Sequence, residues 1–233
     1  MISAILFDWG GTLDSDGLHW LDRFYEIYSK TDFKDISKPK IKEAFYWADA
    51  QAEKDPSIRT AGLREMMDRH VRWQFEKLGL KDPKQAIAVA AAFWKPSERI
   101  LRRNRRILEN LSYHGIRLGI ISNFYGNIET LCREFRFFSH LKVILDSAVV
   151  GMYKPDPKIF SFALEKLGLP AEQVAFVGDS FERDIVPAKS IGMRTYWLIG
   201  DQNKTPPSPH QTDGVLCSLE DLPRELLKTG QAV

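Results

Sequence analysis

The chain has 233 residues, of which 44% are apolar and 27% are charged, a composition typical of a soluble globular protein with a sizeable core. Its 33 lysines and arginines nearly balance 31 aspartates and glutamates, and the net charge of +2 lacks the basic excess of a nucleic-acid-binding protein. The longest unbroken apolar run, Ala86 to Trp94, has nine residues. Because a spanning helix needs about 20, we expect no membrane segment.

The N-terminus and the cysteines predict the compartment. Asp8 follows seven uncharged residues, and the absence of a basic segment there argues against a signal peptide. Cys132 and Cys217 form no CxxC pair, as expected of structural thiols in a reducing environment. We therefore expect a cytoplasmic protein.

The first predicted element is a strand. The apolar run over residues 3–7 stops at Asp8 and passes into Gly10 and Gly11. Short apolar runs bounded by glycine are typical of buried strands, and two adjacent glycines of a turn. Asp8 is thus expected at the carboxyl end of a buried strand.

The next 80 residues predict helices only. Apolar spacing and punctuation by proline and glycine indicate helices over residues 18–30, 39–54, 60–78 and 83–94. A helical segment of this length is too long for a loop. We predict a cap subdomain at residues 17–96, with hinges near 15–17 and 95–98. Its aromatic residues, by their helical spacing, are expected mainly in the core of the cap.

The remainder of the chain alternates between strands and helices. A strand over residues 116–121 precedes Ser122 and Asn123, and another over 174–177 precedes Gly178 and Asp179. Weaker strands are predicted at 142–145, 195–198 and 215–217, and helices at 157–167, 181–191 and 219–227.

This alternation predicts the fold class. Strand followed by helix, repeated, is typical of an α/β protein with a doubly wound parallel sheet. The predicted core comprises residues 1–16 and 97–233, with the all-helical cap inserted between them. In such sheets ligands bind beyond the carboxyl ends of the strands, where Asp8, Ser122 and Asp179 are expected.

Four motifs in this order resemble those of the haloacid dehalogenase (HAD) superfamily, whose members are mostly magnesium-dependent phosphohydrolases with a Rossmann-like core. The motifs cover nearly the whole chain. They are Phe7-Asp8-Trp9-Gly10-Gly11-Thr12-Leu13-Asp14, then Ser122-Asn123, then Lys154-Pro155-Asp156, and finally Gly178-Asp179-Ser180 with Asp184.

The resemblance implies a role for each matching residue. Asp8 would be the nucleophile that forms an aspartyl-phosphate, while Ser122 and Lys154 hold the phosphoryl group. Magnesium would be bound by oxygen ligands, as this ion prefers. The implied ligands are the Asp8 carboxylate, the Gly10 carbonyl, Asp179 and Asp184, and the implied substrate-binding residues are Gly11, Thr12 and Asn123.

One position departs from the family pattern. Phosphatases of the superfamily have a second aspartate two residues after the nucleophile, which acts as general acid and base; here that residue is Gly10. General acid–base catalysis is worth about 10²–10⁴ in rate, so hydrolysis of ordinary phosphate esters should be slow. Asp14 and Asp16 are nearby in sequence and could substitute.

Several functions stay open. A small phosphate ester or an acyl phosphate, whose leaving group needs little protonation, is the expected substrate class. A carbon–phosphorus bond hydrolase of the phosphonoacetaldehyde type would need a cap lysine, for which Lys40, Lys42 and Lys54 are candidates. Dehalogenation is disfavoured by the acidic fourth motif. A catalytically degenerate phosphate- or partner-binding protein is the non-enzymatic alternative, and the oligomeric state is not predicted.

Overall fold

The computed structural model describes residues 1–202, 205 and 211–228. Within them, the strands are β1 (Ala4–Phe7), β2 (Arg117–Ser122), β3 (Leu141–Asp146), β4 (Val174–Gly178), β5 (Arg194–Leu198) and β6 (Gly214–Leu216). These six parallel strands form one sheet in the order β3-β2-β1-β4-β5-β6, which confirms the predicted fold class.

The central strand β1 explains why polar residues gather at one edge. All four of its residues are fully buried, as an apolar run between two neighbours requires. Phe7 pairs in register with Ile120 of β2 and Val177 of β4. Since the three strands run parallel and end together, the residues that come after them emerge at the same edge.

Helices form the layers on both faces of the sheet and a separate bundle beside it. The helices are α1 (Trp20–Ser29), α2 (Lys38–Lys54), α3 (Leu63–Leu78), α4 (Pro83–Tyr113), α5 (Ile128–Glu134), α6 (Ser147–Val150), α7 (Pro157–Leu167), α8 (Val186–Ser190) and α9 (Leu222–Lys228). Side chains alternate along β1: Ile5 and Phe7 belong to a buried cluster that includes residues of α4, α5 and α9, whereas Ala4 and Leu6 belong to one that includes residues of α7 and α8.

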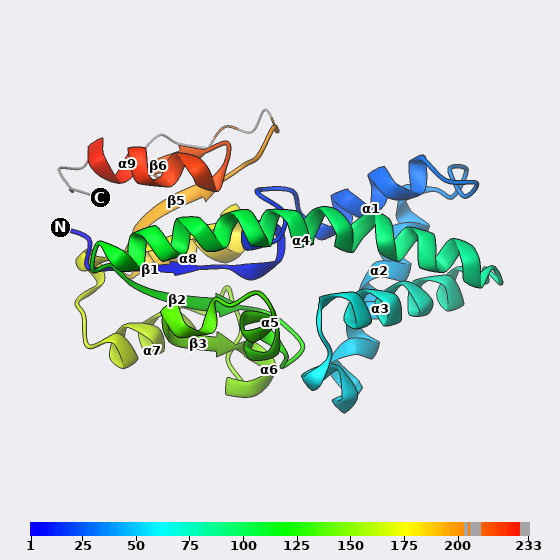
Figure 1. Ribbon diagram of the computed structural model, residues 1–233, viewed down its shortest axis with the longest axis horizontal. Helices are drawn as coiled ribbons and strands as arrows, with labels where there is room; N and C mark the ends of the chain where they lie inside the picture. Colours follow the sequence, from blue (N-terminus) through cyan, green and yellow to red (C-terminus); the bar gives the residue numbers. More distant parts are fainter. Residues whose placement is uncertain (203–204, 206–210, 229–233) are drawn as a thin grey trace.

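The segment predicted as a cap is helical, as expected. Helices α1, α2, α3 and the first half of α4 pack together at the end of the molecule away from the sheet (Figure 1). Residues 17–96 contain no strand, and Phe24, Phe75 and Phe93 are buried in the core of this bundle. The division of the chain at 16/17 and 96/97 remains a prediction.

Helix α4 differs from the prediction. The predicted helix end at Trp94 is wrong, because α4 continues through Pro96 as one helix of 31 residues. Phe93 and Leu101, on either side of the proline, are both fully buried, so tertiary packing supports the helix across the missing hydrogen bond. Figure 1 shows α4 extending from the cap along the core.

No helix in the described residues combines the length and the apolar character that a membrane crossing requires.

Candidate active site

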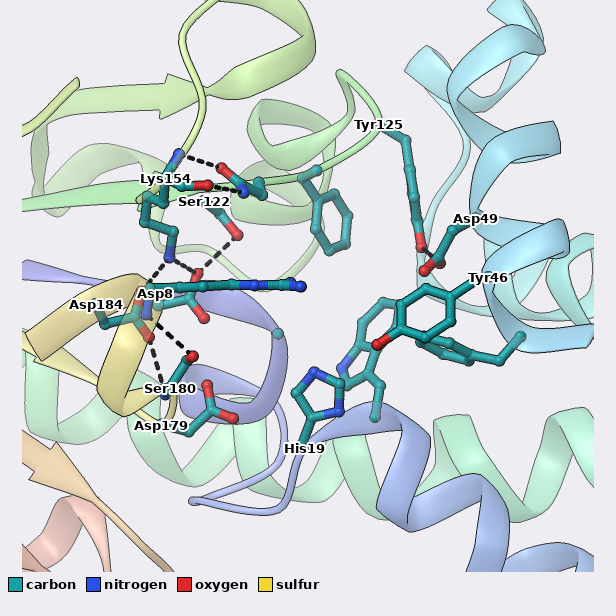
Figure 2. Close-up of a pocket in the computed structure, with 16 residues that line it drawn as sticks. Asp8, His19, Tyr46, Asp49, Ser122, Tyr125, Lys154, Asp179, Ser180 and Asp184 are labelled. Carbon is teal, nitrogen blue, oxygen red and sulfur yellow. Dashed lines mark hydrogen bonds and ion pairs between the residues drawn. The ribbon is translucent and has the colours of Figure 1, made fainter. Parts of the chain in front are cut away.

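The residues predicted to carry the chemistry converge on one cavity. Asp8 follows β1, Ser122 ends β2, and Asp179 follows β4. Together with Lys154 and Asp184 they line a cavity of about 120 Å³, whose opposite wall comes from the cap (Figure 2). The aligned carboxyl ends of three parallel strands therefore bring together groups that are up to 176 residues apart in the chain, from Asp8 to Asp184.

Lys154 connects two of the carboxylates. Its Nζ donates to Asp8 Oδ1 at 2.7 Å and to Asp184 Oδ1 at 2.6 Å, and the Ser122 hydroxyl donates to the same Asp8 oxygen at 2.9 Å. Burial acts to lower the pKa of Lys154, but Asp184 and Asp8 together raise it. The lysine is thus kept as a buried cation beside the expected nucleophile.

Three buried carboxylates share this site. Oxygen atoms of Asp8, Asp179 and Asp184 all lie within 4.8 Å of one another. Burial, then the charges of Asp8 and Asp184, hold the pKa of Asp179 well above its usual range. Burial also raises the pKa of Asp184 to about 6. One lysine does not balance three acids, and an all-oxygen donor set of this kind fits a hard divalent cation such as Mg²⁺.

Two glycines make room for these carboxylates. A Cβ on Gly11, whose φ is +88°, would lie 2.4 Å from Asp179 Oδ2, and a Cβ on Gly178 would lie 2.3 Å from Asp184 Oδ2. Any side chain at either position would displace a carboxylate. The glycines of the first and fourth motifs are thus steric requirements of the acidic site.

Gly10 lines the cavity, and the indole of Trp20 covers it. A Cβ on Gly10 would lie 3.4 Å from both Cε2 and Nε1 of Trp20. Trp20 Nε1 donates to Asp14 Oδ2 at 2.6 Å, and the Gly11 amide donates to Asp14 Oδ1 at 2.9 Å. Burial raises the pKa of Asp14 to about 6. Neither Asp14 nor Asp16 lines the cavity, which argues against the expectation that one of them acts there as an acid or base.

The residues predicted to bind substrate contribute in other ways. Thr12 is fully buried beneath the cavity and donates to Asp179 Oδ1 at 3.3 Å. Asn123 lines the cavity, but its amide exchanges two hydrogen bonds of 2.8 Å with the backbone of Lys154. These contacts orient Asp179 and Lys154. Direct binding of substrate by Gly11, Thr12 and Asn123 stays a prediction.

The cap supplies one wall of the cavity, and the sequence did not predict which residues form it. Phe45 and Tyr46, two aromatic residues of the cap, were expected mainly in its core; Phe45 is buried, but both line the cavity. No sequence pattern marks His19, Trp20 or Asp49 as residues of the site. The way the cap docks on the core decides which of its side chains face Asp8. The core adds Phe124, Tyr125, Ser180 and Arg183.

His19 is held as a neutral hydrogen-bond donor. Its Nδ1 accepts from the Leu21 amide at 3.2 Å, which leaves the ring proton on Nε2. Burial, together with Arg183, outweighs nearby carboxylates and lowers the pKa of the ring. In this tautomer the Leu21 amide occupies Nδ1, so His19 is placed as a hydrogen-bond donor rather than as a base.

Comparison with known proteins identifies the family. Residues 2–192 match the model of the haloacid dehalogenase-like hydrolases. The haloacid dehalogenase-like hydrolase domain-containing protein 3 of Danio rerio is 29% identical over 202 residues, covering 82% of this chain and 83% of that protein. Glyceraldehyde 3-phosphate phosphatase of Methanocaldococcus jannaschii is 27% identical over 227 residues, covering 95% and 96%.

Solved structures agree in fold. A HAD phosphatase from Thermococcus onnurineus is 22% identical with a TM-score of 0.54, covering 97% of this chain and 98% of that one. A magnesium-bound putative HAD hydrolase from Bacillus subtilis is 18% identical with a TM-score of 0.56, covering 97% and 99%. The chain belongs to the haloacid dehalogenase-like hydrolase family: it is a hydrolase with phosphatases among its relatives.

Proposed function

We propose that this protein is a magnesium-dependent phosphohydrolase that acts on a small phosphate ester or acyl phosphate through an aspartyl-phosphate on Asp8. The observation that carries the proposal is the buried group of Asp8, Asp179 and Asp184, with Lys154 bonded to two of them. The phosphatase name of one relative that aligns over 95% of the chain supports the same reaction class.

Magnesium would be held by the carboxylates of Asp8, Asp179 and Asp184 and by the Gly10 carbonyl. When bound, the ion neutralises the negative charge that otherwise repels an anionic nucleophile from a phosphate. The chain contributes the rest of the charge balance through Lys154, and Thr12 keeps the Asp179 carboxylate oriented through its hydroxyl.

The two oxygens of Asp8 have different surroundings. Oδ1 accepts from Ser122 and Lys154, whereas no described residue donates to Oδ2. We assign Oδ2 the attack on phosphorus. The new bond joins this oxygen to phosphorus while the bond to the leaving oxygen breaks, and water then hydrolyses the aspartyl-phosphate to release phosphate and restore the carboxylate.

The absence of a side chain at Gly10 attenuates this cycle. The leaving oxygen must take its proton from solvent, and the second water must lose its proton without a dedicated base. Substrates with good leaving groups therefore suit the site best. The cavity of about 120 Å³ is below the about 300 Å³ of typical ligand pockets, which favours a substrate of few carbon atoms.

The carbon–phosphorus alternative has no support in the cavity. Among the described residues that line it, Lys154 is the only lysine, and it is bonded to two carboxylates. Lys40, Lys42 and Lys54 of the cap lie outside the lining. An imine with an aldehyde substrate therefore has no lysine placed to form it.

Asp8→Asn tests the proposal. Phosphate release from acetyl phosphate and from small esters should require Mg²⁺ and fall at least 10³-fold in the variant, because the amide is not a nucleophile. The matched control is Asp82→Asn at the N-cap of α4, where asparagine caps equally well. Metal-independent turnover, or turnover unchanged in Asp8→Asn, would exclude this mechanism.

A further inference from the structure

Asp49 of α2 lies in the wall of the cavity that faces the catalytic carboxylates. It is the only charged cap residue among the described residues of the lining, where its neighbours are His19, Trp20, Phe45 and Tyr46. Figure 2 shows Asp49 across the cavity from Asp8. The mechanism proposed above makes no use of this carboxylate, although its side chain is only 26% exposed.

A chain of hydrogen bonds inside the cap holds Asp49 in place. The Tyr28 hydroxyl donates to Gln74 Oε1 at 3.1 Å, which turns Gln74 Nε2 toward His70 Nδ1 at 2.9 Å. The ring proton of His70 is then on Nε2, 3.0 Å from Asp49 Oδ1. Tyr28, His70 and Gln74 are fully buried, so each donor in the chain points toward the carboxylate.

A second donor reaches Asp49 from the core. The hydroxyl of Tyr125, in the segment after β2, donates to the same Oδ1. Burial and the charge of Asp49 raise the pKa of Tyr125, so this hydroxyl stays protonated and keeps donating. Because Tyr125 belongs to the core and Asp49 to the cap, this bond joins the two parts of the molecule at the cavity.

The other oxygen of Asp49 is available to a ligand. Both hydrogen bonds end on Oδ1, and no described residue donates to Oδ2. The side chain is partly exposed to the cavity, so Oδ2 can accept a hydrogen bond from a ligand donor in place of water. A ligand carboxylate at the same place would meet a like charge.

We propose that Asp49 is a specificity-determining residue that selects phosphate substrates carrying a hydroxyl or ammonium group at the end remote from phosphorus and disfavours those carrying a carboxylate there. The inference rests on the proposed phosphohydrolase function and deepens it. Phosphate would be bound at the Lys154 end of the cavity, and the donor group at the Asp49 end.

A panel of four small phosphates tests this selection in wild type and in Asp49→Asn: glycerol 3-phosphate, phosphoethanolamine, phosphoglycolate and propyl phosphate. We expect kcat/KM in the variant to fall about tenfold or more for the first two. It should rise for phosphoglycolate and change less than threefold for propyl phosphate. The fall should be larger for phosphoethanolamine, because asparagine keeps an acceptor for a hydroxyl but loses the charge that attracts an ammonium.

Asp35→Asn is the matched control. It removes the same charge from an exposed position of the cap outside the lining of the cavity, so it should preserve the ratios among the four substrates. If Asp49→Asn changed all four by one factor, Asp49 would hold the cap only, and the inference would be overturned.

Binding separates this inference from the proposed function. If neither protein turned over any of the four compounds or acetyl phosphate, the phosphohydrolase proposal would fail alone. Dissociation constants in the Asp8→Asn background, measured by calorimetry with Mg²⁺, would then decide the role of Asp49. A preference for the hydroxyl and ammonium compounds that Asp49→Asn removes would support it. Equal or undetectable binding of all four would overturn it.

Discussion

Gly10 and Trp20 form a pair at the floor of the active site. The backbone of Gly10 (φ −73°, ψ 122°) is open to any residue, so its conformation does not require glycine. A Cβ there would lie 3.4 Å from the indole of Trp20, at van der Waals contact, so the indole limits the space for a longer side chain. Trp20 is in turn fixed by its bond to Asp14 and by edge contacts with Phe93 and Phe124.

This packing predicts the effect of restoring an acid. Gly10→Asp alone should raise kcat less than threefold, because Trp20 prevents the carboxyl group from reaching the leaving oxygen. Gly10→Asp with Trp20→Leu should raise kcat for propyl phosphate at least tenfold, within the about 10²–10⁴ that acid–base catalysis supplies. Steady-state kinetics would show little gain with p-nitrophenyl phosphate, whose leaving group needs no proton.

Trp20→Leu alone is the control and should give no gain. If the single Gly10→Asp variant matched the double variant, Trp20 would not obstruct the position.

At the scale of elements, α4 connects the cap to the core. Ser97 accepts from Arg23 of α1 at 2.6 Å, and Asn104 donates to the Leu13 carbonyl at 2.8 Å. One helix therefore packs against the cap with its first half and against the sheet with its second half. Pro96 lies between the two halves and leaves the Ala92 carbonyl without its helical donor.

Pro96→Ala should stabilise the protein. Alanine restores the hydrogen bond and removes the steric conflict of the ring, so the free energy of unfolding in urea should rise by about 1–3 kcal/mol. Pro83→Ala, at the first position of the same helix, is the control and should change it by about 0.5 kcal/mol or less, because the amide there has no helical acceptor. Equal effects at the two positions would mean that α4 is not strained at Pro96.

At the scale of the whole molecule, the near-zero net charge conceals a local imbalance. Over the whole chain, 33 basic residues offset 31 acidic ones. The buried site, however, contains three carboxylates, those of Asp8, Asp179 and Asp184, and one lysine, Lys154. Burial of unbalanced charge is unfavourable. The folded state should therefore be stabilised by any cation that binds there.

Thermal unfolding checks this expectation without an activity assay. Mg²⁺ should raise the Tm of the wild type over that in EDTA, by linkage of binding to folding. Asp179→Asn should unfold at an equal or higher temperature than wild type in EDTA, since it removes one buried charge, but should gain much less from Mg²⁺. A variant that gained as much from Mg²⁺ as wild type would show that Asp179 is not a ligand.

The sequence by itself determined the six strands, the helical insertion and the residues at the carboxyl ends of β1, β2 and β4. It could do so because a buried parallel strand is a short apolar run, and because parallel strands in register bring the residues after their carboxyl ends to one edge. The local sequence pattern therefore predicts the positions of Asp8, Ser122 and Asp179 without knowledge of any tertiary contact.

Only the tertiary structure decided the cap side of the site and the path of α4. Which face of α2 presents Asp49 and Tyr46 depends on how the cap docks, and the pairing of Asp49 with Tyr125 joins residues 76 positions apart. Likewise, the proline that predicted a helix end is overridden by the burial of Phe93 and Leu101 on either side of it. Side-chain packing between distant segments leaves no local pattern, so it is fixed only when the segments meet.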